Sequence, residues 1–221
     1  PNIDPYEEKF VASDLEQAKA LFALIKPELT PTTDLILAPE TYFTEGFGYS
    51  LPSLSSSFLY QSISEELSRI EPIQLLTGIQ LYQVYSEADK TPTSNKMGNQ
   101  WVDFYNSAFL SGTNSLQVYH KSKLVVGTET LPYKQIIEPL FGNIMLDLGG
   151  TVRSRAVDTD RKVFQLKNGS KVGPIICYES VYGSFVGGYV RNGAEFLAVM
   201  TNDAWLVLNH LRQTFLHKDR Y

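Results

Sequence analysis

The chain has 221 residues, of which 43% are hydrophobic and 19% charged, a composition typical of globular proteins and unlike that of disordered or collagen-like chains. Its 24 acidic and 19 basic residues give a net charge of −5, which argues against nucleic acid as a partner because phosphate binding needs a basic surface. A single cysteine excludes an intrachain disulfide and an all-cysteine metal site.

The first part of the chain alternates helical and strand patterns. Ser13 and Glu16 have the spacing of a capping box, and apolar residues then recur on one helical face until Pro27. Short continuous apolar runs farther along are typical of buried strands. The predicted segments are a helix over 13–26, a strand over 35–38, a loop over 41–56, a helix over 58–70 and a strand over 73–82.

The second part of the chain continues this alternation, which predicts the α/β class. Its predicted segments are a flexible connection over 86–99, a strand pair over 105–111 and 116–120, a long functional or mobile loop over 127–155, a strand over 172–177, a helix over 180–191 and a strand over 196–200. No linker divides these segments, so we expect one domain over residues 1–221.

Both ends of the sequence read as cut. The chain opens at Pro1 rather than at Met and stops abruptly at Tyr221. It shows no signal peptide and no apolar run near the ~20 residues of a membrane helix. We therefore expect a fragment of a longer protein.

Three polar residues stand where predicted strands end: Glu40, Lys121 and Cys177. Ligands of α/β sheets bind at the carboxyl ends of strands, so these residues are candidates for a functional site. A strand-to-helix turn would aim helix N–H groups at the Cys177 thiol and lower its pKa, which favours a nucleophile. By position alone, however, a buried apolar cysteine is the more frequent explanation.

Residue type and spacing leave the other two candidates open as well. Glu40 fits a general base, but also an exposed loop carboxylate or a helix cap. Lys121 and Lys123 point to one face of a predicted strand, where either could stabilise an oxyanion or form a solvated edge. A cysteine–histidine dyad would need a histidine near Cys177, and the spacing places none there. The histidines also lack the spacing of a zinc site.

Taken together, the three candidates resemble the catalytic motifs of the nitrilase, or carbon–nitrogen hydrolase, superfamily. The motifs are Leu-Ile-Leu-Ala-Pro-Glu at 35–40, Tyr-His-Lys-Ser-Lys-Leu at 119–124 and Ile-Ile-Cys-Tyr-Glu at 175–179. The family places its lysine two residues after an aromatic residue, which selects Lys121 over Lys123. The resemblance implies a nitrilase-like αββα sandwich, here truncated at the C-terminus.

Within this superfamily the chain is most similar to the extracytoplasmic domain of bacterial apolipoprotein N-acyltransferases, in the form found in Bacteroidetes. The similarity rests on Leu-Val-Val-Gly-Thr-Glu-Thr-Leu-Pro at 124–132, Asp-Leu-Gly-Gly-Thr at 147–151, Cys-Tyr-Glu at 177–179 and Thr-Asn-Asp-Ala-Trp at 201–205. Tyr6 falls near an aromatic position that this branch uses.

The resemblance implies acyl transfer in two steps through a thioester on Cys177. Glu40 would act as base and acid, and Lys121, with a backbone N–H near Tyr178, would hold the oxyanion. Glu129 would orient Lys121 or the nucleophile. The acyl donor would be a phospholipid, and the acceptor would be the α-amino group of an apolipoprotein's N-terminal diacylglyceryl-cysteine.

The same resemblance implies supporting roles and a cellular location. Tyr178 and Glu179 would shape the acyl pocket and its entrance, and no metal or organic cofactor would be required. Membrane helices outside this sequence would attach the domain to the bacterial inner membrane, facing the periplasm.

Two other functions remain open at this point. A soluble nitrilase-family amidase would use the same three residues and hydrolyse a C–N bond with water as the second nucleophile. An extracytoplasmic binding domain of the same fold would hold Glu40, Lys121 and Cys177 apart from one another.

Overall fold

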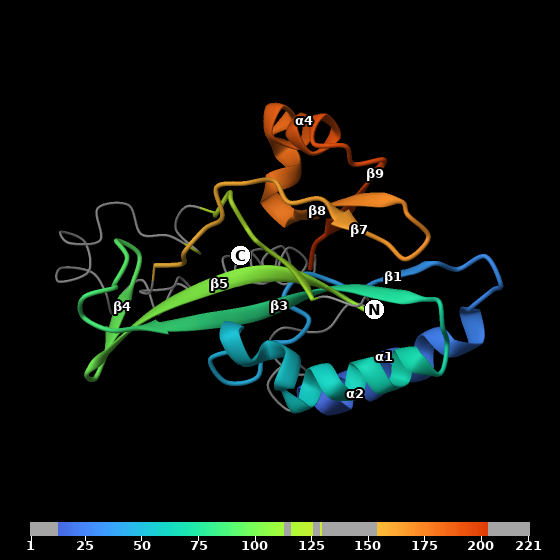
Figure 1. Cartoon of the computed structure of the whole chain (residues 1–221), viewed down its shortest axis with the longest axis horizontal. Helices are drawn as coiled ribbons and strands as arrows, with labels where there is room; N and C mark the ends of the chain where they lie inside the picture. The colour runs from blue at the N-terminus through green and yellow to red at the C-terminus, as the bar shows by residue number, and fades with distance from the viewer. Residues whose placement is uncertain (1–12, 113–115, 126–128, 130–153, 203–221) are drawn as a thin grey trace, which may run out of the picture.

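Two β-sheets pack face to face, and helices cover their outer surfaces (Figure 1). The computed structural model describes residues 13–112, 116–125, 129 and 154–202. Helices α1 (Asp14–Ile25) and α2 (Phe58–Ser68) lie on the larger sheet, and α4 (Gly183–Arg191) lies on the smaller one. These four layers are the α/β sandwich that the resemblance predicted.

The larger sheet is built on one long antiparallel pair, β3 (Gln74–Tyr85) with β5 (Gln100–Ser111). Alternate residues of this pair face opposite layers. Leu76 and Leu110 pack toward the smaller sheet, whereas Leu75 and Phe109 pack toward α1 and α2. The other strands are β1 (Leu35–Leu37) and β2 (Tyr49–Ser50), parallel to β3, and β4 (Asn95–Met97) and β6 (Gln117–His120), antiparallel to β5.

The smaller sheet has the order β7–β8–β9 in the described residues. Its strands are β7 (Phe164–Gln165), antiparallel to β8 (Lys171–Ile176), and β9 (Phe196–Met200), parallel to β8. A 3₁₀ helix, η3 (Cys177–Val181), follows β8 directly. The carboxyl end of β8 therefore leads straight into the turn that carries the only cysteine of the chain.

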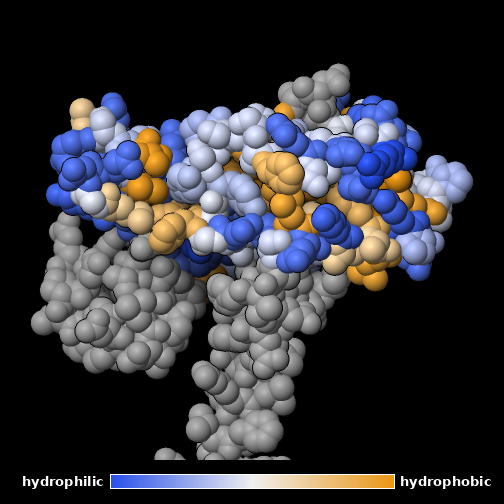
Figure 2. Space-filling view, turned by 90° about the horizontal axis from the view of Figure 1, so that it is seen from below, coloured by the Kyte–Doolittle hydropathy of each residue, from blue (hydrophilic) through white to orange (hydrophobic). Residues whose placement is uncertain are grey.

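The first helix begins as its sequence predicts. The Ser13 hydroxyl accepts a hydrogen bond from the Glu16 N–H at 3.3 Å, and the Glu16 carboxylate accepts one from the Ser13 N–H at 2.9 Å, which completes the capping box. Figure 2 views the molecule from the side of α1 and α2, where hydrophilic and hydrophobic residues are interspersed. Among the described helices, none is long and apolar enough to cross a membrane.

Several short elements lie inside segments that the sequence left as loops. They are β2, the 3₁₀ helices η1 (Lys26–Glu28) and η2 (Leu51–Ser56), β4 and β7. Two- and three-residue strands carry too few residues for a period of two to show, and they form because a longer neighbour offers unpaired backbone groups. β3 and β5 are also longer than the predicted strands over 73–82 and 105–111. Most of the loop predicted over 127–155 lies outside the described residues.

Candidate active site

The turn after β8 holds Cys177 in an unusual backbone conformation. Its φ is 48°, in the left-handed region that residues other than glycine seldom adopt. The preceding residues are buried strand, so the turn lifts the thiol out of β8 at the carboxyl edge of the smaller sheet. The strand-to-helix turn predicted at Cys177 is confirmed, although its first element is 3₁₀ rather than α-helical.

The protonation state of the thiol differs from the sequence prediction. Burial, followed by the negative charge of Glu40, raises the pKa of Cys177 to about 11, against the opposing effects of Lys121 and the Tyr178 backbone N–H. The prediction of a lowered pKa is therefore wrong, because the turn lies in the protein interior and faces a carboxylate. At neutral pH the sulfur carries its proton and needs a base to react.

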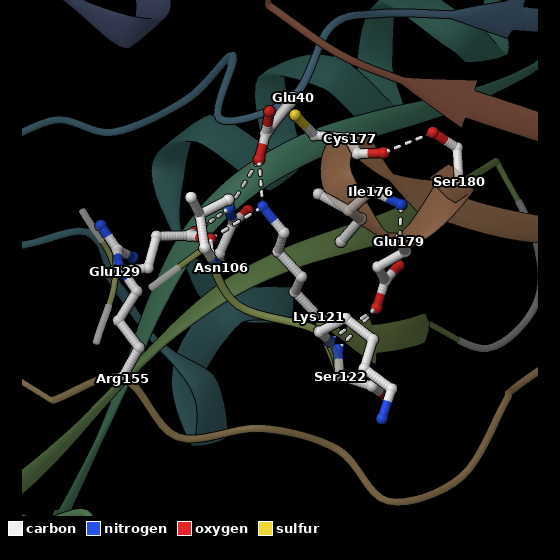
Figure 3. A network of polar contacts seen from close by, with 12 residues as sticks. Glu40, Asn106, Lys121, Ser122, Glu129, Arg155, Ile176, Cys177, Glu179 and Ser180 are labelled. Atoms are coloured by element: carbon white, nitrogen blue, oxygen red, sulfur yellow. Dashed lines mark hydrogen bonds and ion pairs between the residues drawn. The ribbon is translucent and has the colours of Figure 1, made fainter. Parts of the chain in front are cut away.

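Glu40 faces this thiol from the larger sheet. Its Oε1 atom accepts hydrogen bonds from Lys121 Nζ at 2.9 Å and from Asn106 Nδ2 at 2.8 Å. Figure 3 shows the other carboxylate oxygen turned toward the sulfur of Cys177. One oxygen is thus fixed in place while the other is positioned to receive the thiol proton.

Gly78 allows the backbone to place Glu40 opposite the Cys177 thiol. The backbone after β1 crosses β3 at this glycine, where the Gly78 N–H donates to Pro39 O at 3.1 Å and the Phe43 N–H donates to Gly78 O at 3.2 Å. A Cβ on Gly78 would lie 2.3 Å from the Thr41 backbone nitrogen. Only a residue without a side chain permits such a close crossing.

We expect Gly78→Ala to displace Glu40 and slow alkylation of Cys177 by about 10²-fold, since a shift of about 1 Å at a reacting group can have that effect. The measurement is the rate of iodoacetamide labelling by mass spectrometry. Gly183→Ala is the matched control, because a Cβ there meets nothing within 4 Å at the start of α4, and it should label at the wild-type rate. An unchanged rate in Gly78→Ala would contradict this account of the crossing.

Lys121 lies at the centre of the polar cluster and is almost fully buried. Its Nζ is 2.9 Å from Glu40 Oε1 and 2.9 Å from Glu129 Oε2. Burial opposes its charge, but the two carboxylates outweigh burial and raise the pKa of Lys121, so the group remains an ammonium ion. The Lys123 Nζ lies instead over the rings of Tyr182 and Phe185, away from this cluster.

Glu129 is the second carboxylate of the cluster. Besides the ion pair with Lys121, its carboxylate accepts hydrogen bonds from the Val125 N–H and from Asn106 Nδ2, each at 2.9 Å. Burial works against ionisation, yet Lys121 and these hydrogen bonds together lower the pKa of Glu129. The Lys121 ammonium ion therefore contacts two carboxyl groups, those of Glu40 and Glu129.

The remaining supporting candidates lie in different surroundings. Glu179 is fully buried and accepts hydrogen bonds from the N–H groups of Ser122 and Ile176 at 2.6 and 2.8 Å, so it braces two backbone turns, and its role at an acyl pocket stays a prediction. Tyr178 is partly exposed beside Tyr182, at the surface next to the thiol. Tyr6 lies outside the described residues.

Asn106 and Arg155 belong to the site and are not among the residues that the sequence motifs indicated. Asn106 Nδ2 bridges Glu40 and Glu129, and a buried amide inside the apolar strand β5 was the available signal. Arg155 lies beside Glu129 in Figure 3, and nothing in its sequence context pointed to the site.

A histidine partner for Cys177 is not found in the described part of the chain. Burial lowers the pKa of His120 to about 4, so it is neutral, and its Nδ1 is 2.7 Å from the Ser107 hydroxyl. The other two histidines, His210 and His217, lie outside the described residues. Within the described ranges no group of three His, Cys, Asp or Glu residues could hold a metal ion.

Comparison with known families agrees with this geometry. The sequence model of the Carbon-nitrogen hydrolase family matches residues 11–214. The chain belongs to this family. The solved structure of Nit3 of Saccharomyces cerevisiae, a member of branch 10 of the nitrilase superfamily, aligns with a TM-score of 0.56 and 14% identity over 87% of this chain and 61% of Nit3. At that identity the similarity supports the fold alone.

Two curated proteins are similar to the chain in sequence. The chain is 28% identical to "Apolipoprotein N-acyltransferase 1" of Treponema pallidum over 185 residues, which are 80% of this chain and 32% of that protein. It is also 28% identical to "Apolipoprotein N-acyltransferase" of Chlorobaculum tepidum over 212 residues, which are 93% of this chain and 38% of that protein. The chain thus spans about a third of the length of these relatives.

Proposed function

We propose that the protein is an N-acyltransferase that carries an acyl chain on Cys177. The observation that supports this most is the convergence of a base, an ammonium ion and a protonated thiol from three strand ends (Figure 3). The relatives named apolipoprotein N-acyltransferase support the choice of transferase.

In the first half-reaction, Glu40 takes the Cys177 proton and the sulfur attacks the carbonyl of a phospholipid ester. Lys121 and the Tyr178 N–H stabilise the tetrahedral oxyanion. The intermediate collapses to a thioester, and the lysophospholipid alkoxide leaves with the proton from Glu40.

In the second half-reaction, the α-amino group of an N-terminal diacylglyceryl-cysteine attacks the thioester carbonyl. Glu40 takes the amine proton and returns it to the departing sulfur, which restores the enzyme and releases an amide. This half-reaction makes the apolipoprotein the acyl acceptor and places the site at the periplasmic face of the bacterial inner membrane.

A nitrilase-family amidase is the second candidate, because it would use the same three groups with water in place of the amine. The acceptor distinguishes the two. The protein, in detergent micelles, is incubated with a phospholipid that carries deuterated acyl chains, with and without a synthetic diacylglyceryl-cysteine peptide.

We expect a hydroxylamine-sensitive mass gain on the Cys177 peptide, and transfer of the deuterated chain to the acceptor peptide when it is present. Cys177→Ala should show neither. Release of free fatty acid at one rate with and without the acceptor would favour hydrolysis. The absence of any thioester would overturn the proposal.

A further inference from the structure

Arg155 is held beside the site by its backbone on both sides. The Asn95 side chain donates to Ser154 O at 2.9 Å and accepts from the Ser154 N–H at 3.1 Å. On the other side, the Ala156 N–H donates to Phe104 O at 2.8 Å, and the backbones of Arg155 and Phe104 form an isolated parallel β-bridge on β5. This anchoring fixes the position of Arg155 independently of any contact that its own side chain makes.

The Arg155 side chain is partly buried and only partly hydrogen-bonded. Nη2 donates to Gln80 Oε1 at 3.2 Å, whereas Nη1 is buried and has no hydrogen-bond partner in the part of the chain that the structure describes. Gln80 is the β3 residue paired with Asn106 in the sheet register, and Asn106 holds both site carboxylates. Arg155 therefore connects through one neighbour to the residue that joins Glu40 and Glu129.

A cation with a buried nitrogen needs compensation, and Nη1 receives none from a hydrogen bond within the described residues. The charged groups that act on the guanidinium are Glu129 and Glu40, with Lys121 on their far side. Burial lowers the pKa of Arg155, and the negative charges of Glu129 and then Glu40 oppose this shift without cancelling it. Figure 3 shows the guanidinium on the side of Glu129.

The charges of the cluster balance only when Arg155 is counted. By formal charge at neutral pH, Glu40 and Glu129 contribute two negative charges, and Lys121 and Arg155 contribute two positive ones. We propose that Arg155 is a positioning residue of this site. Its guanidinium offsets the negative charge of Glu129, so that the Lys121 ammonium stays directed at Glu40 and at the oxyanion that forms on the substrate. Since Nη1 is buried, a bound anion could not reach it without displacing the chain, which favours this role over ligand binding.

This inference rests on the proposed role of Cys177 as nucleophile, but not on the identity of the acyl donor. Its test is the pH profile of iodoacetamide labelling of Cys177. Removing a cation raises the pKa of nearby carboxyl groups, and we expect a rise of about one unit for Glu40, the proposed base. In Arg155→Met the acidic limb of the profile should move about one pH unit upward, which is a tenfold slower reaction on that limb.

Two further variants separate charge from packing. Arg155→Lys keeps the positive charge and should return the limb toward its wild-type position. Gln80→Met removes the hydrogen-bond acceptor of Nη2 without altering Arg155 and should shift the limb in the same direction by a smaller amount. This variant also tests the inference if Arg155→Met does not fold. Arg69→Met, which removes an exposed arginine paired only with surface glutamates of α2, is the control and should leave the profile unchanged.

The outcomes distinguish this inference from the proposed function. An unshifted limb in Arg155→Met and in Gln80→Met overturns the inference alone. A rate lowered equally at every pH, with no recovery in Arg155→Lys, assigns Arg155 to packing and also overturns it. If Cys177 of the wild-type protein is not labelled at any pH, both this inference and the proposed function fail.

Discussion

Replacing Glu40 by glutamine is expected to slow acylation and alkylation of Cys177 by about 10²–10⁴-fold, the usual contribution of a general base. The amide keeps an oxygen where Lys121 Nζ and Asn106 Nδ2 donate, so the neighbouring groups retain their partners. What the substitution removes is a negative charge and a group that can accept the thiol proton.

These two losses act in opposite directions, which makes the variant decisive. After burial, the charge of Glu40 is the largest cause of the raised pKa of Cys177. With a pKa of about 11, only about 0.03% of the thiol is ionised at pH 7.5, and loss of the charge increases that fraction. If Glu40 acted through its charge alone, Glu40→Gln would react faster than the wild-type protein.

The measurement is the second-order rate of iodoacetamide labelling between pH 6 and pH 10. In Glu40→Gln the rate should rise about tenfold per pH unit through the neutral range, because it then follows the free thiolate. The wild-type profile should be flatter. Glu65→Gln, at an exposed position of α2, should behave as the wild-type protein does. A variant rate equal to or above that of the wild type at pH 7 would rule out Glu40 as the base.

Replacing Glu179 by glutamine should have the second large effect, on both stability and activity. One carboxylate oxygen accepts from the Ile176 N–H beneath Cys177, and the other accepts from the Ser122 N–H next to Lys121. Tyr119 OH donates to the second oxygen as well, at 2.5 Å. This buried carboxylate therefore ties the nucleophile turn to the lysine turn.

Glutamine cannot reproduce this arrangement in either orientation. In each orientation its amide NH₂ group would face a backbone N–H, so two buried donors would point at each other and neither would have an acceptor. We expect a loss of about 3 kcal/mol in the free energy of unfolding, since hydrogen bonds to a charged group and an unsatisfied buried donor each contribute roughly 1–3 kcal/mol. Cys177 labelling should also slow, because the turn that carries Cys177 and the turn that carries Lys121 are no longer held in their relative positions.

Denaturant unfolding with matched m-values measures the stability, and the labelling assay measures the activity. Glu65→Gln should change stability by less than about 1 kcal/mol, because it breaks only an exposed ion pair. Wild-type stability in Glu179→Gln would show that the brace has no energetic role. A loss of stability without any change in labelling would confine Glu179 to the fold.

The sequence by itself determined the class of fold, the longer helices and strands, and the three polar residues at strand ends. These features are local: a capping box, a helical or strand period and a motif order are all written in neighbouring residues. The family assignment follows from the same motifs. The position of Tyr6 and the single-domain extent of the chain remain predictions.

Only the tertiary structure decided how the candidate residues are used. It placed Lys121, which the family motif had already selected, between two carboxyl groups, placed Glu179 under the turns, and added Asn106 and Arg155. It also reversed the predicted pKa shift of Cys177. The physical reason is common to all of these: each property depends on the charges and hydrogen-bond partners supplied by segments distant along the chain, and on burial between two sheets, neither of which a local pattern encodes.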